Sequence, residues 1–204
     1  MRYNKKKFIY LISPSKINAT FYRHLENVLK QKKVSFFQLR LKNERFKKKL
    51  IIGKKIKKIC KKFKVKFLIN DDAFLAKKLN ADGCHLGQND MKINKARKLI
   101  GDKIIGITCH NSIKLAKVAL RDKADYLAFG AFYSTRTKKT KYKSSFNIIK
   151  KVRKITKTPI VAIGGINSDN YKKLLLNKAN LLAISGYIWK NKKFKPFEAI
   201  KKLK

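Results

Sequence analysis

Short apolar runs recur along the chain, and a longer stretch with lysines on one side and apolar residues on the other follows each of them. Most runs are nearly continuous in hydrophobicity, which is typical of parallel strands covered on both faces. Gly, Asp, Asn or Pro residues bound them and indicate turns. The sequence therefore predicts eight strands, at residues 8–13, 34–40, 65–71, 83–87, 103–109, 126–132, 159–164 and 180–186.

The stretches between the runs predict amphipathic helices. Residues 21–33 place Leu25, Val28 and Leu29 on one face, and residues 46–62 show the same period. Strict alternation of strand and helix, with short connections that cross over with a right hand, favours a closed parallel barrel. We therefore predict a single (β/α)8 TIM barrel over residues 1–204, with an open doubly wound sheet as the alternative.

Composition adds an extreme positive charge to this picture. The 204 residues include 54 Lys and Arg against 11 Asp and Glu, a net charge of +43. Such a charge predicts nonspecific binding to polyanions at low salt. The lysines are spread over nearly every predicted helix, without the interleaved aromatic residues of a base-stacking surface, so we expect no specific nucleic-acid partner. The apolar run at 8–12 is too short for a signal peptide, and no run approaches the roughly 20 residues of a spanning helix, so we expect a soluble cytoplasmic protein without a membrane partner.

The three cysteines, Cys60, Cys84 and Cys109, form no even set and lack the spacing of metal ligands, which fits a reducing compartment. Two of them are followed by a histidine, His85 and His110. Neighbours along a strand point to opposite faces, so each pair offers one inward side chain at most. This pattern favours core cysteines over a zinc site.

A short motif precedes three of the predicted strands. An alanine and then a side chain with a carboxyl or carboxamide group occur in Ala81-Asp82, Ala124-Asp125 and Ala179-Asn180. Each motif lies where a helix gives way to a strand, and recurrent helix capping is the explanation that the sequence favours.

Polar residues gather at the carboxyl ends of the predicted strands, where barrels of this kind build their active sites. At the end of the second strand, Gln38, Arg40 and Lys42 alternate with Leu39 and Leu41, so that the polar side chains share one side. An ordinary polar strand end is the alternative explanation.

Acidic residues, scarce elsewhere, follow two neighbouring strands. Asn70, Asp71 and Asp72 end the third strand, and Asp90 follows the fourth. Two carboxylates completed by water and a substrate phosphate are a common way to hold Mg²⁺. The alternative is helix capping by Asp71 or Asp72 and a turn at Asp90.

Residues 130–145, after the sixth strand, are rich in hydroxyl groups and cations that could close over a pyrophosphate as a lid. Glycines at 164–165 and 186 follow the seventh and eighth strands, where such barrels commonly bind phosphate. A plain surface loop is the alternative for residues 130–145.

Taken together, these segments resemble the thiamine phosphate synthase family over most of the chain. The motifs are QLRLK at 38–42, IND at 69–71, DGCHLGQND at 82–90, GITCH at 106–110, DYLAFGAFYSTRTKK at 125–139 and AIGGI at 162–166. Several motifs in a fixed order are more specific than any single one.

The resemblance implies a transferase of thiamine biosynthesis, which joins a hydroxymethylpyrimidine pyrophosphate to a thiazole phosphate and releases pyrophosphate. It implies Mg²⁺ as cofactor and small-molecule partners, and a homo-oligomer is compatible with it. The implied metal ligands are Asp71 and Asp90, and the implied catalytic residues are Arg40 and Lys138. The implied substrate-binding residues are Gln38, Arg40, Lys42, Asn70 and Lys138 for the pyrophosphate, Thr135, Thr137, Gly165, Ile184 and Ser185 for the thiazole phosphate, and Thr108.

The sequence departs from the family pattern at several places. Thr108 stands where the family usually has Ser, and Ser13-Pro14 stands where it has Thr-Asp. Ala131 replaces a Pro, and the stretch after Lys139 lacks a customary Gly. Two alternatives follow: a thiazole tautomerase using an acid-base residue such as His110, and a non-catalytic basic barrel that binds polyanions.

Overall fold

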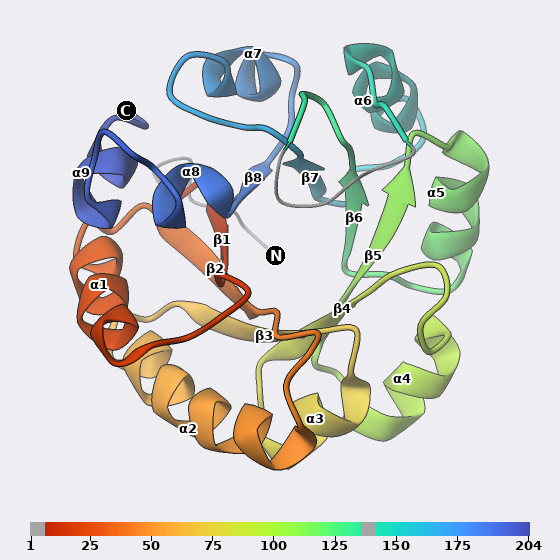
Figure 1. Cartoon of the computed structure of the whole chain (residues 1–204). Helices are drawn as coiled ribbons and strands as arrows, with labels where there is room; N and C mark the ends of the chain where they lie inside the picture. Colours follow the sequence, from red (N-terminus) through yellow and green to blue (C-terminus); the bar gives the residue numbers. More distant parts are fainter. Residues whose placement is uncertain (1–6, 136–141) are drawn as a thin grey trace.

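Eight parallel strands form a closed barrel in which each strand pairs with its neighbours in chain order and β8 returns to β1 (Figure 1). The computed structural model describes residues 7–135 and 142–204. The strands are β1 Ile9–Ile12, β2 Val34–Leu39, β3 Lys66–Asn70, β4 Gly83–Leu86, β5 Ile104–His110, β6 Tyr126–Phe129, β7 Ile160–Ile163 and β8 Leu181–Ile184.

Helices surround the barrel as an outer ring (Figure 1). They are α1 Ala19–Leu29, α2 Phe46–Lys62, α3 Ala73–Lys78, α4 Ile93–Ile100, α5 Ile113–Arg121, α6 Phe146–Arg153, α7 Tyr171–Leu176, α8 Gly186–Trp189 and α9 Pro196–Lys201. The predicted (β/α)8 TIM barrel is therefore confirmed, and the open sheet is excluded.

The strands bury both faces, as their continuous hydrophobicity predicts. In β1, Ile9 and Leu11 belong to the core between barrel and helices, whereas Tyr10 and Ile12 belong to a second core inside the barrel. Phe36, Leu68, Tyr126, Ala128, Val161, Leu181 and Ala183 complete that inner core. The barrel interior is thus filled with side chains below the site at its carboxyl end.

The repeated motif fastens each helix end to the sheet. Asp82 accepts from Phe67 N at 2.8 Å, Asp125 from Ile105 N at 2.8 Å, and Asn180 from Ile160 N at 2.8 Å. Each of these side chains lies just before one strand and accepts a hydrogen bond from the backbone of the preceding strand in the barrel. The motif is a recurrent structural device, but the helix capping that the sequence suggested is wrong for these side chains, because they accept from N–H groups of strands.

The predicted elements match the observed ones closely, and their ends differ. The sixth strand ends at Phe129 and not at 132, and α1 ends at Leu29 because Lys32 has the left-handed φ of 56°. The cysteines are buried free thiols. Within the described residues, no helix is long and apolar enough to cross a membrane.

Candidate functional site

Two carboxyl groups and a lysine meet at the carboxyl ends of β2, β3 and β4. Asp71 directly follows β3 and has a φ of 62°, a left-handed conformation that Asp tolerates better than most residues. Its N–H donates to the His85 carbonyl at 2.7 Å, and Lys42 Nζ lies 3.2 Å from its carboxylate. The Asp90 carboxyl group lies close enough to Asp71 to share a hydrogen bond with it and to shift its pKa. The sequence predicted these three residues at one site, and the fold brings them together.

The two carboxyl groups have pKa values shifted in opposite directions. Burial alone would raise the pKa of Asp71, but the hydrogen bond with Asp90 and the charge of Lys42 outweigh it and hold the pKa below its usual value. Burial raises the pKa of Asp90 despite the hydrogen bond from Gly87 N, and the Asp71 carboxylate raises it further. Two carboxyl groups this close resist double ionisation, so Asp90 keeps its proton to higher pH than Asp71.

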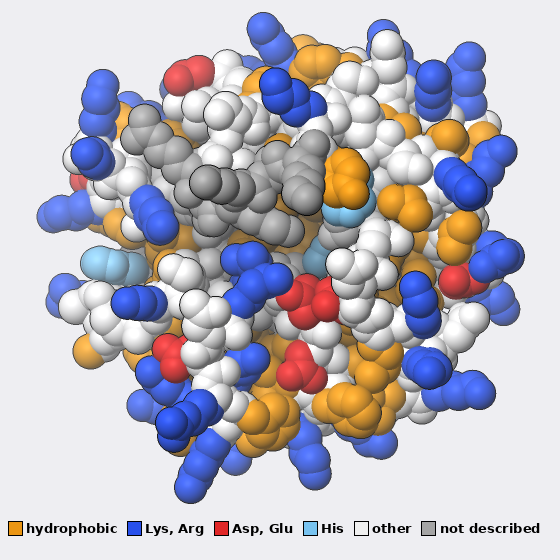
Figure 2. Space-filling view, turned by 45° about the vertical axis from the view of Figure 1, so that its right-hand side comes forward, with side chains coloured by type: hydrophobic (Ala, Val, Ile, Leu, Met, Phe, Trp, Pro, Cys, Tyr) orange, Lys and Arg blue, Asp and Glu red, His pale blue; other side chains and the backbone are white. Residues whose placement is uncertain are grey.

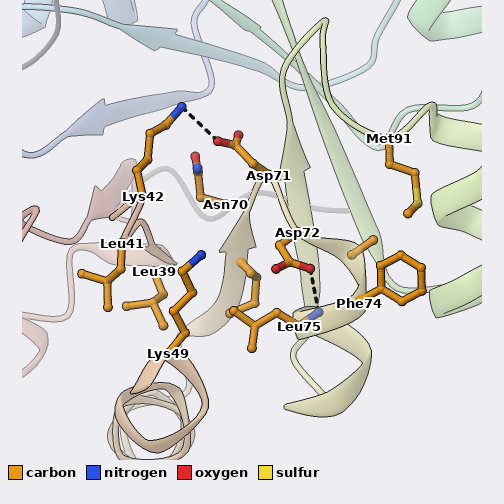
Figure 3. Close-up of a pocket in the computed structure, with 12 residues that line it drawn as sticks. Leu39, Leu41, Lys42, Lys49, Asn70, Asp71, Asp72, Phe74, Leu75 and Met91 are labelled. Atoms are coloured by element: carbon orange, nitrogen blue, oxygen red, sulfur yellow. Dashed lines mark hydrogen bonds and ion pairs between the residues drawn. The ribbon is translucent and has the colours of Figure 1, made fainter. Parts of the chain in front are cut away.

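Asp72 has a structural role. Its side chain accepts from Leu75 N at 2.8 Å and caps α3, so the capping that the sequence left open between Asp71 and Asp72 belongs to Asp72 (Figure 3). Asp90 both joins the acidic pair and closes a turn, with Gly87 N donating to it at 2.6 Å.

A cavity of about 380 Å³ opens beside the acidic pair, between the starts of α2 and α3. Leu39, Leu41 and Leu75 form an apolar wall, and Lys49 and Lys42 extend into the same region from α2 and the end of β2 (Figure 3). Asn70 also lines it. In the space-filling view, acidic side chains lie near the middle of the face with basic side chains directly beside them, and many more lysines and arginines surround its edge (Figure 2).

The polar residues at the end of β2 divide between the interior and the rim. Gln38 is 3% exposed and donates from Nε2 to Tyr10 Oη at 2.7 Å. Leu39 and Leu41 are buried in the outer core, which confirms the predicted alternation. Arg40 is half-buried, and its side chain forms no hydrogen bond with a described residue, while its N–H donates to Ser13 Oγ at 2.9 Å.

A chain of hydrogen bonds crosses the barrel below the mouth. Tyr10 Oη lies 2.8 Å from Tyr126 Oη, which lies 2.9 Å from His85 Nδ1. His85 Nε2 lies 2.9 Å from Thr108 Oγ1. The chain joins residues of β1, β4, β5 and β6, and through Tyr10 it reaches Gln38 of β2. It connects two predicted substrate-binding residues, Gln38 and Thr108.

The same histidine is neutral at ordinary pH, because burial lowers its pKa to about 4 against the attraction of Asp71. Its neighbour Cys84 is fully buried in the outer core, as is Cys109 beside His110. Each Cys-His pair thus has its cysteine in the outer core, as predicted. His110 stacks on Tyr142, with ring centroids 4.0 Å apart.

The loops after β6 and β7 are held together by glycines. Gly164 and Gly165 have φ values of 106° and 61°, and a Cβ on Gly165 would lie 2.3 Å from the Ser134 carbonyl oxygen. Tyr133 N donates to the Gly164 carbonyl at 3.1 Å. This contact brings the loop that carries half-buried Thr135 beside Gly165.

The end of β8 contributes the remaining predicted residues. Ile184 is buried, and Ser185 Oγ donates to the Ser13 carbonyl at 3.2 Å, which ties β8 to the end of β1. Ser13 also receives the Arg40 N–H. Ser13, a departure from the family pattern, therefore joins the ends of three strands.

A family model described as thiamine monophosphate synthase matches residues 9–188. The chain belongs to this family. The thiamine-phosphate synthase of Pelagibacter ubique (strain HTCC1062) is 70% identical over 207 residues, covering 100% of both chains. That of Erythrobacter litoralis is 38% identical, over 89% of this chain and 87% of the relative. The solved thiamine phosphate pyrophosphorylase from Pyrococcus furiosus is 25% identical, has a TM-score of 0.85 and is matched over 98% of this chain and 94% of its own.

The donor set at the mouth of this thiamine monophosphate synthase family member fits a hard divalent cation. Among residues 7–135 and 142–204, no group of three or more His, Cys, Asp or Glu side chains is placed to hold a metal. Asp71 and Asp90, however, approach each other closely enough to hydrogen bond. A cation between two such carboxylates would relieve their repulsion, and Mg²⁺ takes its other ligands from water and phosphate oxygens.

Two predicted residues, Thr137 and Lys138, lie outside the described part of the chain. Conversely, the motifs of the sequence indicated no role for Tyr10 or Tyr126, and for His85 they indicated only a possible metal ligand. A polar signal was present, because both tyrosines stand in otherwise apolar strands of this family member. Their partners could not be identified from the sequence, since 116 residues separate the two hydroxyl groups.

Proposed function

We propose that this chain is a transferase of thiamine biosynthesis that joins a hydroxymethylpyrimidine pyrophosphate to a thiazole phosphate and releases pyrophosphate. The observation that carries the proposal is the placement of Lys42, Asp71 and Asp90 at adjoining strand ends in a member of this family. A cation and two carboxylates suit a metal-bound pyrophosphate better than an uncharged substrate.

In this proposal, Asp71 and Asp90 would hold Mg²⁺, which supplies positive charge to the departing pyrophosphate. Arg40 and Lys138 are the proposed catalytic cations, because they would stabilise the negative charge that grows on the leaving group. Gln38, Lys42 and Asn70 would hold the same substrate. Departure of pyrophosphate leaves a cation stabilised by the pyrimidine ring, so no protein nucleophile is required.

The thiazole phosphate would lie across the mouth, at the loops after β6, β7 and β8. The residues proposed for it are Thr135, Thr137, Gly165, Ile184 and Ser185. The contact between Gly165 and the backbone of Ser134 supports this placement, because it sets the two loops side by side. Phosphorylated substrates and three reduced cysteines further support a cytoplasmic location.

Pyrophosphate release by the purified protein tests the proposal. We expect release when both substrates and Mg²⁺ are present, and loss of it with EDTA, in Asp90→Ala and in Lys138→Ala. Asp102→Ala, at an exposed position, is the matched control and should retain activity. No release by the wild-type protein, or full activity in Asp90→Ala, would contradict the synthase. Isomerisation of a thiazole without pyrophosphate release would identify a tautomerase in its place.

A further inference from the structure

The ring of Tyr126, on β6, fills the space beside Gly106 of β5. Tyr126 is fully buried, and a Cβ on Gly106 would lie 1.8 Å from its Cζ atom. The ring also makes an edge contact with Tyr10, at 5.7 Å between centroids, and stacks on His85, at 5.6 Å. Packing alone therefore fixes this ring, and its hydroxyl group is not needed to hold it there.

That hydroxyl group nevertheless lies at the middle of the hydrogen-bond chain. It is 2.8 Å from Tyr10 Oη on one side and 2.9 Å from His85 Nδ1 on the other. In neutral imidazole one nitrogen carries the proton and the other accepts, so the partner of Nδ1 influences which nitrogen is protonated. The protonated nitrogen also decides whether Nε2 donates a hydrogen bond to Thr108 Oγ1 or accepts one from it.

We propose that Tyr126 is a positioning residue that holds the proton of His85 on Nε2 and thereby makes the Thr108 hydroxyl group a donor toward the substrate. The Gln38 amide donates to Tyr10 Oη, so the Tyr10 hydroxyl group is able to donate to Tyr126 Oη, and the Tyr126 hydroxyl group is then able to donate to His85 Nδ1. Nε2 then donates to Thr108 Oγ1, whose own proton points to another acceptor.

We expect the Thr108 hydroxyl group to contact the pyrimidine pyrophosphate, and this assignment of the substrate rests on the proposed function. Thr108 lies on β5, and its partner His85 bonds through its carbonyl to Asp71, at the acidic side of the mouth. The proposed thiazole phosphate residues at the ends of β7 and β8 lie across the barrel from β3 and β4, whereas β5 pairs directly with β4 (Figure 1). A heteroaromatic ring nitrogen is an acceptor of the kind that a Thr108 donor would recognise.

The first experiment reads the tautomer directly by ¹⁵N NMR of histidine-labelled protein, with His85 assigned by its absence from His85→Asn. We expect a protonated Nε2 in the wild-type protein and a mixture of tautomers in Tyr126→Phe. Tyr171→Phe is the matched control, because it removes another buried tyrosine hydroxyl group, whose partner is the Lys204 carbonyl, and should leave the spectrum of His85 unchanged. A wild-type His85 protonated on Nδ1 overturns the inference, and this result does not depend on the folding of Tyr126→Phe.

The second experiment measures KM for both substrates. In Tyr126→Phe, we expect KM for the pyrimidine pyrophosphate to rise about tenfold, the effect of one lost hydrogen bond, while KM for the thiazole phosphate stays unchanged. An equal rise in both KM values, or none, contradicts a positioning role. If the wild-type protein releases no pyrophosphate, the proposed function fails, and the tautomer still decides the role of Tyr126.

Discussion

At the scale of single residues, backbone conformation separates the site from the rest of the barrel. Asp71 and His110 have left-handed φ values of 62° and 54° at the ends of β3 and β5. The other non-glycine residues with positive φ in the described chain, Lys32, Lys64, Asn80, Lys123 and Lys178, follow helices and help to end them. The left-handed conformation of Asp71 therefore forms the turn that directs its carboxylate into the site, while Asp72 caps α3.

The half-buried side chain of His85 predicts a pH dependence of stability. Because burial lowers the pKa of His85 from 6.5 to about 4, the unfolded chain binds a proton at higher pH than the folded chain. The stabilisation is fully present above pH 6.5 and is lost as the pH falls through about 4. We expect a loss of roughly 3 kcal/mol in the free energy of unfolding over this window, measured with urea.

His85→Asn isolates this contribution, because the carboxyl groups still titrate in that variant. Its free energy of unfolding should fall less than that of the wild-type protein between pH 7 and the lower end of the window. Parallel curves for the two proteins would show that the titration of His85 does not contribute.

At the scale of elements, basic side chains donate to backbone carbonyl groups at the ends of helices. Lys33 Nζ donates to the carbonyl of Lys201, the last residue of α9, at 3.2 Å, and Lys57 Nζ donates to the carbonyl of Leu79, directly after α3, at 3.0 Å. Helix ends leave carbonyl groups without partners inside the helix, and cations satisfy them well. Part of the basic excess is therefore structural.

The side chain of Asp125 offers a test of the repeated motif. It accepts from Ile105 N at 2.8 Å and from Arg97 Nη2 at 2.7 Å, so Asp125→Ala leaves a strand N–H without its acceptor. We expect the free energy of unfolding to fall by about 1–3 kcal/mol, as measured by urea denaturation.

Two matched variants sharpen that expectation. Asp125→Asn should retain most of the stability, because Asn180 performs the same task with its amide oxygen. Asp102→Ala, at an exposed position, should change it little. If Asp125→Ala proved as stable as Asp102→Ala, the motif would not hold the sheet.

At the scale of the whole molecule, charge and fold make separate contributions. With 54 basic and 11 acidic residues, most cations have no acidic partner within the chain. Their mutual repulsion opposes the compact state, and the buried cores must outweigh it. The proposed reaction uses only a few of these cations, which are Arg40, Lys42 and Lys138.

Ionic strength should therefore raise the stability of this protein. Between about 0.01 M and about 0.15 M salt the Debye length falls from about 30 Å to about 8 Å, so repulsion between lysines is screened. We expect Tm to rise by several degrees in KCl over this range, as measured by calorimetry, and binding to heparin to weaken over the same range. A constant or falling Tm would mean that repulsion is a minor term.

The sequence by itself determined the eight strands, the helices between them and the polar residues at the strand ends. These features depend on the local hydrophobic period and on the order of the motifs, both of which can be identified in the amino-acid sequence alone. Asp71, Asp90 and Lys42 could be placed together because carboxyl ends of parallel strands meet at one face of a barrel.

Only the tertiary structure decided how those residues are partnered. Closure of the barrel sets Tyr10 against Tyr126, and Gly106 makes room for the second ring, so that Gln38 and Thr108 are connected through His85. It also assigned capping to Asp72 and left Asp71 to the acidic pair. Contacts between residues this distant in sequence depend on strand register and side-chain direction, and neither is encoded in any local stretch.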